Sequence, residues 1–257
     1  MGVLNVTPDS FADGGRFLRH EDALAHGARM ADEGADIVDV GGESTRPGSD
    51  PVGEQEELDR VAPVVEGLAR TIGARISVDT SKPRVAEACL RLGASLVNDV
   101  TGLTDDAMIR TAKEGGAGVV VMHMRGRPKT MQQDVVYDDV VREVSRFLAE
   151  RARVARGAGI DEVIVDPGIG FGKTAAHNFE ILKRLDEIAS LGYPVLVGPS
   201  RKSFLGSLPS KLPSSERLEG TLAAVAVCAL HGASIVRVHD VLQTKRVVEV
   251  VDAVRGA

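Results

Sequence analysis

Short apolar runs alternate with longer amphipathic segments along the chain. The runs are rich in Val and Ile and are bounded by Gly, Pro, Asp and Asn, which is typical of buried parallel strands. They predict eight strands, at Gly2–Val6, Ala35–Val40, Arg75–Asp79, Ser95–Asp99, Gly118–His123, Glu162–Asp166, Pro194–Gly198 and Ser234–Val238.

Helical periodicity fills the intervals between these runs. In Tyr137–Arg156, apolar residues such as Val140 and Val144 recur at helical spacing. A second helix is expected at Pro83–Leu92, with Ser81 as its N-cap and Pro83 in its first turn. The chain therefore consists of repeated strand–helix units.

Eight such units in 257 residues predict an α/β protein with a (β/α)₈ TIM barrel, formed as one domain over residues 1–257. The alternative is an open, doubly wound sheet, which would carry a glycine-rich dinucleotide turn after the first strand. The segment there, NVTPDSFADGG, is not such a turn. A P-loop ending in Gly172-Lys173-Thr174 is also excluded, because Pro167 stands where that motif needs glycine.

Composition narrows the function classes. Hydrophobic residues make up 43% and aromatic residues 3%, without Trp, so the core must consist of aliphatic side chains. A net charge of −6 argues against a nucleic-acid partner. Two cysteines, Cys89 and Cys228, do not suggest a disulfide framework and fit a cytoplasmic setting. We expect neither a signal peptide in MGVLNVTPDSF nor a membrane span, which needs about 18 apolar residues in a row.

Polar residues gather where the predicted strands end. They are Asn5, Asp39, Asp79, Asn98, Met122-His123, Asp166, Ser200-Arg201-Lys202, Arg237 and His239. In a (β/α)₈ barrel, the carboxyl ends of the strands carry the active site. The sequence therefore predicts one rim on which these side chains meet.

Strand alternation indicates which of these side chains point into the barrel mouth. In the last strand, Val236 and Val238 would pack beneath the helices while Arg237 and His239 face inward. Acidic and amide groups on one side suit a flat heterocycle with several N–H groups. Basic groups on the other side suit a phosphate or carboxylate.

Each of these residues also has a purely structural interpretation. A single Asp at a strand end is more often a helix cap, and we assign Asp99 and Asp240 to caps or loops. His123 alone is more often a satisfied structural histidine, and Met122 and Phe171 could belong to the core. The functional interpretation depends on the convergence of many such residues on one rim.

Motifs along almost the whole chain resemble the dihydropteroate synthase family. They are MGVLNVTPDSFADGG at 1–15, GGESTRPG at 41–48, SVDTSKP at 77–83, VNDV at 97–100, MHMRGRPKTMQ at 122–132, DPGIGFGK at 166–173, GPSRKSFLG at 198–206 and RVHDV at 237–241.

The resemblance implies a reaction and a set of ligands. The amine of p-aminobenzoate displaces diphosphate from 6-hydroxymethyl-7,8-dihydropterin diphosphate, with Mg²⁺ accompanying the diphosphate. By the same resemblance, the pterin site contains Asp79, Asn98, Asp166 and Lys202, with Met122 and Arg237 on either side of the ring.

The other ligands take further residues by resemblance. The diphosphate would bind Asn5, Thr45, Arg237 and His239, with Asn5 also a ligand of Mg²⁺. The p-aminobenzoate pocket would contain Thr45, Pro47, Phe171 and Ser200. The residues expected to matter most for catalysis are Asp79, Lys202, Arg237, His239, Thr45 and Arg46, and Asp39 would hold the first two loops or the pterin edge.

We favour a dissociative mechanism, in which the C–O bond to diphosphate breaks before the amine attacks. Two alternatives remain at this point. One is a methyltetrahydrofolate-dependent methyltransferase, which would have no use for GGESTRPG or GPSRKSF. The other is a non-catalytic pterin-binding paralogue, which the retained Asn5, Lys202 and Arg237 argue against. The resemblance also implies a homodimer.

Overall fold

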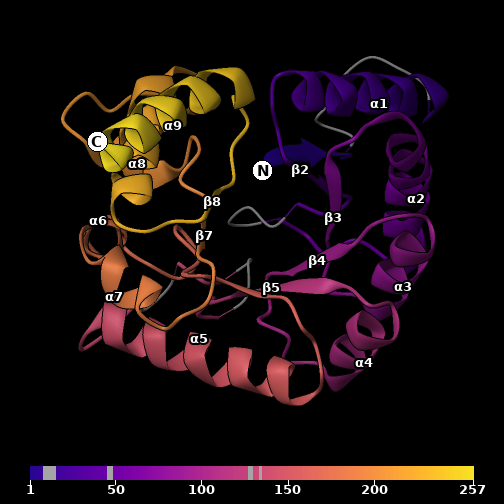
Figure 1. Ribbon diagram of the computed structural model, residues 1–257, viewed down its shortest axis with the longest axis horizontal. Helices are drawn as coiled ribbons and strands as arrows, with labels where there is room; N and C mark the ends of the chain where they lie inside the picture. The colour runs from indigo at the N-terminus through magenta and orange to yellow at the C-terminus, as the bar shows by residue number, and fades with distance from the viewer. Residues whose placement is uncertain (8–15, 45–48, 127–129, 133–134) are drawn as a thin grey trace.

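The protein, studied as a computed structural model, forms a (β/α)₈ barrel (Figure 1). The structure describes residues 1–7, 16–44, 49–126, 130–132 and 135–257. Within these ranges the strands are β1 Gly2–Asn5, β2 Ile37–Gly41, β3 Arg75–Asp79, β4 Leu96–Asp99, β5 Gly118–Met122, β6 Val163–Asp166, β7 Leu196–Val197 and β8 Ile235–Val236. All eight predicted strands are confirmed, most of them one or two residues shorter than expected.

The strands close into one ring. β1 to β6 pair in parallel in chain order, and β7 pairs in parallel with β8. Two single parallel bridges complete the circle, between Val165 and Val195 and between Gly2 and Val238. At the second closure, the Val3 N–H donates to the Val238 carbonyl at 2.9 Å. Every strand therefore presents its carboxyl end on the same rim.

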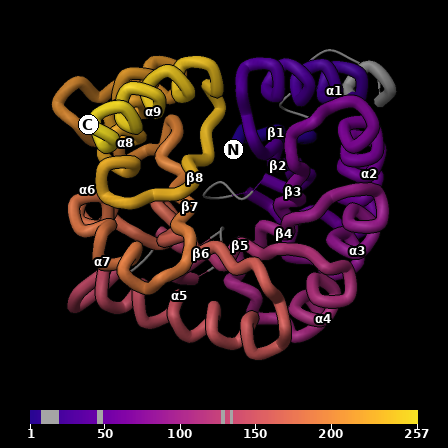
Figure 2. The backbone as a smooth tube through the Cα atoms, viewed as in Figure 1, coloured from indigo at the N-terminus to yellow at the C-terminus, as the bar shows by residue number. Residues whose placement is uncertain are grey.

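Helices surround the strands as an outer ring, and the tube drawing shows the same circular path (Figures 1 and 2). They are α1 Arg16–Asp32, α2 Glu54–Thr71, α3 Pro83–Arg91, α4 Asp106–Glu114, α5 Val140–Gly157, α6 Ala175–Lys183, α7 Leu185–Ala189, α8 Leu218–Leu230 and α9 Val241–Gly256, with 3₁₀ turns at Ser203–Ser207 and Ser214–Glu216.

Two apolar clusters follow from the period-two alternation of the strands. The larger cluster lies between strands and helices and includes Val78, Val165 and Val238. The smaller one fills the barrel interior and consists of Met1, Ile37, Leu96, Val120, Ile164 and Leu196, with Ile235 packed against it. The alternation predicted for the last strand is confirmed, since Val238 packs outward with the helices.

Two helix starts differ from the sequence prediction. The N-cap of α3 is Lys82, so the expectation for Ser81 was wrong, whereas Pro83 does occupy the first turn. Helix α5 begins at Val140 rather than Tyr137. Asp139 sets this start because its carboxylate accepts the Arg142 N–H at 3.0 Å, which an N-cap side chain does for the exposed first turn.

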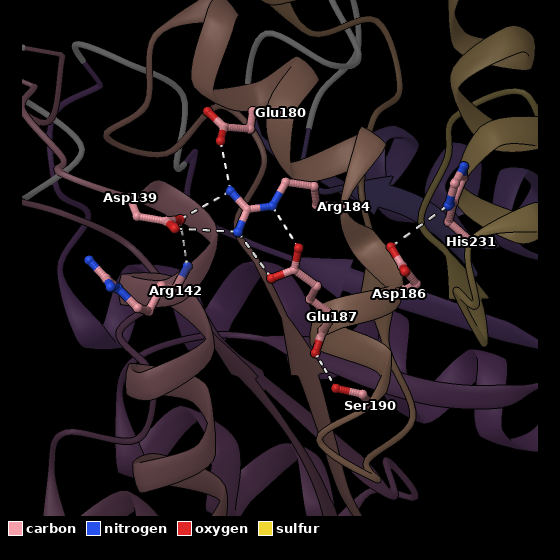
Figure 3. Close-up of polar contacts among 8 residues, drawn as sticks. All are labelled: Asp139, Arg142, Glu180, Arg184, Asp186, Glu187, Ser190 and His231. Carbon is pink, nitrogen blue, oxygen red and sulfur yellow. Dashed lines mark hydrogen bonds and ion pairs between the residues drawn. The ribbon is translucent and has the colours of Figure 1, made fainter.

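Arg184 joins three helices on the outer surface (Figure 3). Its guanidinium donates to Asp139 at the start of α5, to Glu180 of α6 at 2.8 Å and to Glu187 of α7 at 2.7 Å. Because these side chains are 28–50% exposed, solvent screens the ion pairs and each contributes little to stability. None of the helices in the described ranges combines the length and the apolar composition that a membrane span requires.

Candidate functional site

Arg237 links the two acidic strand ends at the barrel mouth. Its Nε donates to Asp39 Oδ2 at 2.6 Å and its Nη2 to Asp79 Oδ2 at 2.8 Å. Asn98, which pairs with Asp79 in the strand register, donates its amide to Asp39 Oδ2 at 3.0 Å. The structure therefore brings four sequence-predicted residues from β2, β3, β4 and the end of β8 into one network.

Three acceptor atoms of this network make no hydrogen bond within the described residues. Asp39 Oδ1, Asp79 Oδ1 and Asn98 Oδ1 are buried and have no hydrogen-bond partner among the described residues. A buried acceptor without a donor costs about 1–3 kcal/mol, so three together at one mouth are unusual for a purely structural network. The site is suited to a ligand that brings several N–H groups.

Burial changes the pKa values of Asp79 and its partner Arg237. Desolvation raises the pKa of Asp79 to about 7, against a lowering by Arg237 and a further rise from Asp39. Burial opposes the charge on Arg237, but the Asp39 and Asp79 carboxylates more than offset this and raise its pKa. A ligand that donates to Asp79 would therefore compete with a proton near neutral pH.

Asp166 and Lys202 form the second half of the mouth. Asp166 Oδ1 accepts the Gly168 N–H at 2.7 Å, which fixes the turn after β6. Lys202 donates to the Ile169 carbonyl of the same turn. Burial raises the pKa of Asp166 and lowers that of Lys202 to about 8, while each charge partly offsets the burial of the other.

Two apolar side chains adjoin these charges. The Phe171 ring lies beside Lys202, with the ammonium 4.6 Å from its centroid. Met122 is almost fully buried and pairs with Asp166 in the strand register. A flat ring entering the mouth would therefore find an aromatic face and a thioether as well as the polar groups.

Ser200 and His239 connect the loops that follow β7 and β8. Ser200 Oγ lies 2.9 Å from His239 Nδ1 and also accepts the His239 backbone N–H at 3.2 Å. Next to them, Arg201 makes a two-point ion pair with Asp240, at 2.9 and 2.6 Å. Asp240 thus holds a loop, as expected, although it occupies the N-cap of α9 without a side-chain cap bond. Asp99 likewise accepts the Thr101 N–H within its own loop.

Asn5 ends β1 and is half-buried. Its amide oxygen is a ligand type that Mg²⁺ accepts, but one neutral oxygen holds the ion weakly. Within the described part of the chain, no group of three or more His, Cys, Asp or Glu residues could hold a metal ion. A Mg²⁺ ion beside Asn5 would therefore need most of its ligands from a bound anion and water.

Thr45, Arg46 and Pro47 lie outside the described residues, so their expected roles stay predictions. The segment just before them is tied to the barrel. Arg60 donates to the Gly42 carbonyl at 2.7 Å. Lys82 binds both Glu43 and the almost fully buried Glu57.

The sequence interpretation missed the role of one residue inside a motif that it quoted. Lys173 is almost fully buried beside His123, and its ammonium approaches the ring nitrogen Nδ1 to 2.9 Å. Its neighbour Thr174 caps α6. A lysine directly before a helix N-cap is the available signal, because the helix dipole disfavours a cation there and some other contact must hold it.

Known proteins resemble this chain in sequence and in architecture. Residues 1–239 match the family described as “Pterin binding enzyme”. The dihydropteroate synthase of Escherichia coli K12 is 48% identical over 259 residues, covering 100% of this chain and 92% of that protein.

Solved structures agree with the sequence matches. A Yersinia pestis dihydropteroate synthase with a sulfonamide drug complex superposes with a TM-score of 0.94 at 45% identity, covering 100% of this chain and 94% of the other. A Xanthomonas albilineans dihydropteroate synthase with 4-aminobenzoic acid gives 0.93 at 45% identity, with coverages of 100% and 93%.

Proposed function

Because the chain belongs to the dihydropteroate synthase family of pterin-binding enzymes, we propose that it makes 7,8-dihydropteroate. Its substrates are 6-hydroxymethyl-7,8-dihydropterin diphosphate and p-aminobenzoate, and diphosphate is the second product. The observation that carries the proposal is the set of unpartnered acceptors on Asp39, Asp79 and Asn98. They match the amino and ring N–H groups of a pterin edge.

The pterin is held on both sides of the mouth. Asp79, Asn98 and Asp166 accept its N–H groups, and the Lys202 ammonium donates to its carbonyl. Met122 and Arg237 flank the ring faces. The exposed fraction of the Arg237 side chain is 22%, which supports contact with a ligand beside its two ion pairs. Asp39 completes the edge by orienting both Arg237 and Asn98.

The diphosphate lies toward Asn5 and His239, with Thr45 and Arg237 as further donors. Mg²⁺ bound to Asn5, the diphosphate oxygens and water would supply positive charge to the leaving group. The p-aminobenzoate ring packs on Phe171, with its carboxylate toward Ser200, and Thr45 and Pro47 close over it. The hydrogen bond between Ser200 and His239 supports this placement, because it puts the two anion sites on adjacent loops.

The charge balance of the mouth supports a dissociative order of events. Three buried carboxylates, on Asp39, Asp79 and Asp166, face the two cations of Arg237 and Lys202. Carboxylates that are ionised at the mouth would stabilise a cationic pterin over a neutral one. The C–O bond breaks and its electron pair leaves with diphosphate. The amine nitrogen then bonds to the exocyclic methylene carbon and releases a proton to solvent.

A coupled assay for diphosphate release tests the function. Release that depends on both the pterin diphosphate and p-aminobenzoate, with dihydropteroate as the product, is the expected result. Binding of the pterin without turnover would indicate a non-catalytic paralogue instead. Methyl transfer from methyltetrahydrofolate to a corrinoid, with no diphosphate release, would indicate the methyltransferase.

Asn5→Ala is expected to weaken Mg²⁺-dependent binding of the pterin diphosphate by about tenfold, the effect of losing one hard oxygen ligand. Asn5→Asp, which keeps an oxygen donor, should bind at least as well as the wild type. Titration calorimetry without p-aminobenzoate, with and without Mg²⁺, measures both variants. Equal Mg²⁺ dependence in Asn5→Ala and wild type would remove Asn5 from the metal site.

We also propose that residues 1–257 act as one pterin-binding domain, in a homodimer and in the cytoplasm. The surface of α8 supports association, because Val227 and Leu230 are exposed on a helix of mostly apolar sequence. The free, buried thiols of Cys89 and Cys228 are compatible with a reducing compartment. Light scattering of the purified protein tests the dimer.

A further inference from the structure

Lys173 is a cation enclosed by acceptors. The residue is 2% exposed. The ammonium lies 2.9 Å from His123 Nδ1, 3.0 Å from the Gly168 carbonyl, 3.0 Å from the Phe171 carbonyl and 3.3 Å from the His123 carbonyl. Together these groups belong to the loops that follow β5 and β6.

The acceptors define the protonation of the pair. The ammonium form has three N–H groups for four acceptors, the three carbonyls and His123 Nδ1, so the His123 carbonyl at 3.3 Å shares a donor with a closer acceptor. His123 Nδ1 must then accept, and the ring proton sits on Nε2. Burial and the adjacent Lys173 lower the pKa of His123 to about 3, so the ring stays neutral at physiological pH. Burial lowers the pKa of Lys173 to about 7, Asp166 opposes this, and the Gly168 and Phe171 carbonyls at 3.0 Å favour the ammonium form.

The contact joins two loops that are already in close approach. Gly168 has a φ of +65°, and a Cβ there would lie 1.9 Å from the His123 carbonyl oxygen. The His123 N–H donates to the Asp166 carbonyl at 2.9 Å. Lys173 thus closes a compact backbone turn whose carbonyls point inward to its ammonium.

This turn carries Phe171, the residue proposed above to pack against p-aminobenzoate. Lys173 binds the Phe171 carbonyl from beneath, and the Phe171 ring lies beside Lys202. Lys202 in turn binds the Ile169 carbonyl. The two lysines therefore bind different carbonyls of one loop, Lys173 those of Gly168 and Phe171 and Lys202 that of Ile169.

We propose that Lys173 and His123 form a positioning pair that sets the β6–α6 loop, and through it the Phe171 ring, for p-aminobenzoate. Neither residue touches substrate. Lys173 fixes the loop backbone, and His123 fixes Lys173 by presenting Nδ1 as an acceptor. The inference rests on the proposed function for the identity of the ligand and on the contacts above for the pair itself.

Three variants test the pair. His123→Leu and Lys173→Met are expected to raise the KM for p-aminobenzoate by about tenfold or more, with less than a threefold change in kcat, because one charge-assisted contact is worth about that factor. His123→Asn keeps an oxygen close to the position of Nδ1, so its KM should stay within about threefold of the wild type. A merely structural role would lower the melting temperature and the active fraction without this rescue.

The possible results test the Lys173–His123 pair separately from the proposed function. Equal KM values for His123→Leu and His123→Asn, or a wild-type KM in Lys173→Met, would overturn the proposal. If Lys173→Met fails to fold, the two His123 variants decide alone. Nitrogen-15 NMR of the wild-type protein should show His123 protonated on Nε2. A proton on Nδ1 would overturn the pair even where no diphosphate release is observed, so this measurement does not depend on the proposed function.

Discussion

Asp79→Asn is expected to lower kcat/KM by about a hundredfold or more and, at pH 8, to make the protein more stable. The loss of activity follows because the carboxylate that accepts pterin N–H groups is replaced by an amide that accepts at only one atom. The gain in stability follows from burial. In the folded protein the pKa of Asp79 is about 7, against an ordinary value of 3.8.

The pH dependence gives the sign of the stability effect. A carboxyl group with a raised pKa in the folded state takes up its proton on folding between pH 3.8 and about 7. Wild-type stability attributable to Asp79 is therefore greatest at low pH and is lost as the pH rises through about 7. Asn carries no such cost, so the stability advantage of the variant should be larger at pH 8 than at pH 5 by roughly 1–3 kcal/mol and should vanish only below about pH 4.

Urea unfolding at pH 5 and pH 8, with steady-state kinetics on the same preparations, checks both effects. A variant that is less stable than the wild type at pH 8 would mean that the ion pair with Arg237 outweighs the burial of Asp79. Turnover close to the wild-type value would remove Asp79 from the pterin site. The wild-type enzyme should also bind pterin less tightly as the pH falls below about 7.

Arg237→Met is expected to abolish activity and, unlike Asp79→Asn, to destabilise the protein by about 3–5 kcal/mol. The guanidinium compensates two buried carboxylates, on Asp39 and Asp79, and its removal leaves both uncompensated. Arg237→Lys should recover little activity, because a point charge cannot reproduce the separate Nε and Nη2 contacts.

The double variant Asp79→Asn/Arg237→Met supplies the control. It removes one of the two uncompensated carboxylates and should recover part of the stability lost in Arg237→Met, without recovering activity. Denaturant unfolding at pH 8 measures the four-member cycle. Strictly additive effects of the two substitutions would show that the ion pair contributes nothing measurable to the fold.

Much of the architecture could be predicted from sequence because it depends on local periodicity. Apolar alternation located all eight strands, and the position of polar residues at strand ends identified the rim. Strand β3 was predicted with its exact bounds, Arg75–Asp79. Helix starts were less accurate, because a cap such as Asp139 is recognised by one hydrogen bond rather than by a repeated pattern.

The pairing of site residues could not be predicted in the same way. The local sequence does not indicate that Arg237 pairs with Asp39 and Asp79. It does not indicate that Ser200 binds His239 either. Such choices depend on where closed strands lie relative to one another. Lys173 shows the same limit, since its place before a helix N-cap indicates only that some contact holds it and does not identify the Gly168 and Phe171 carbonyls.

The span of the Arg237–Asp39 contact has a consequence for how the enzyme matures. The two residues are 198 positions apart, and β8 is the last strand of the barrel. During synthesis, Asp39 and Asp79 leave the ribosome long before the cation that compensates them. Until the final strand docks against β1, the carboxylates of Asp39 and Asp79 lack the counter-charge of Arg237. The proposed pterin site is therefore complete only when the barrel closes, so we expect an unfinished chain not to bind the substrate.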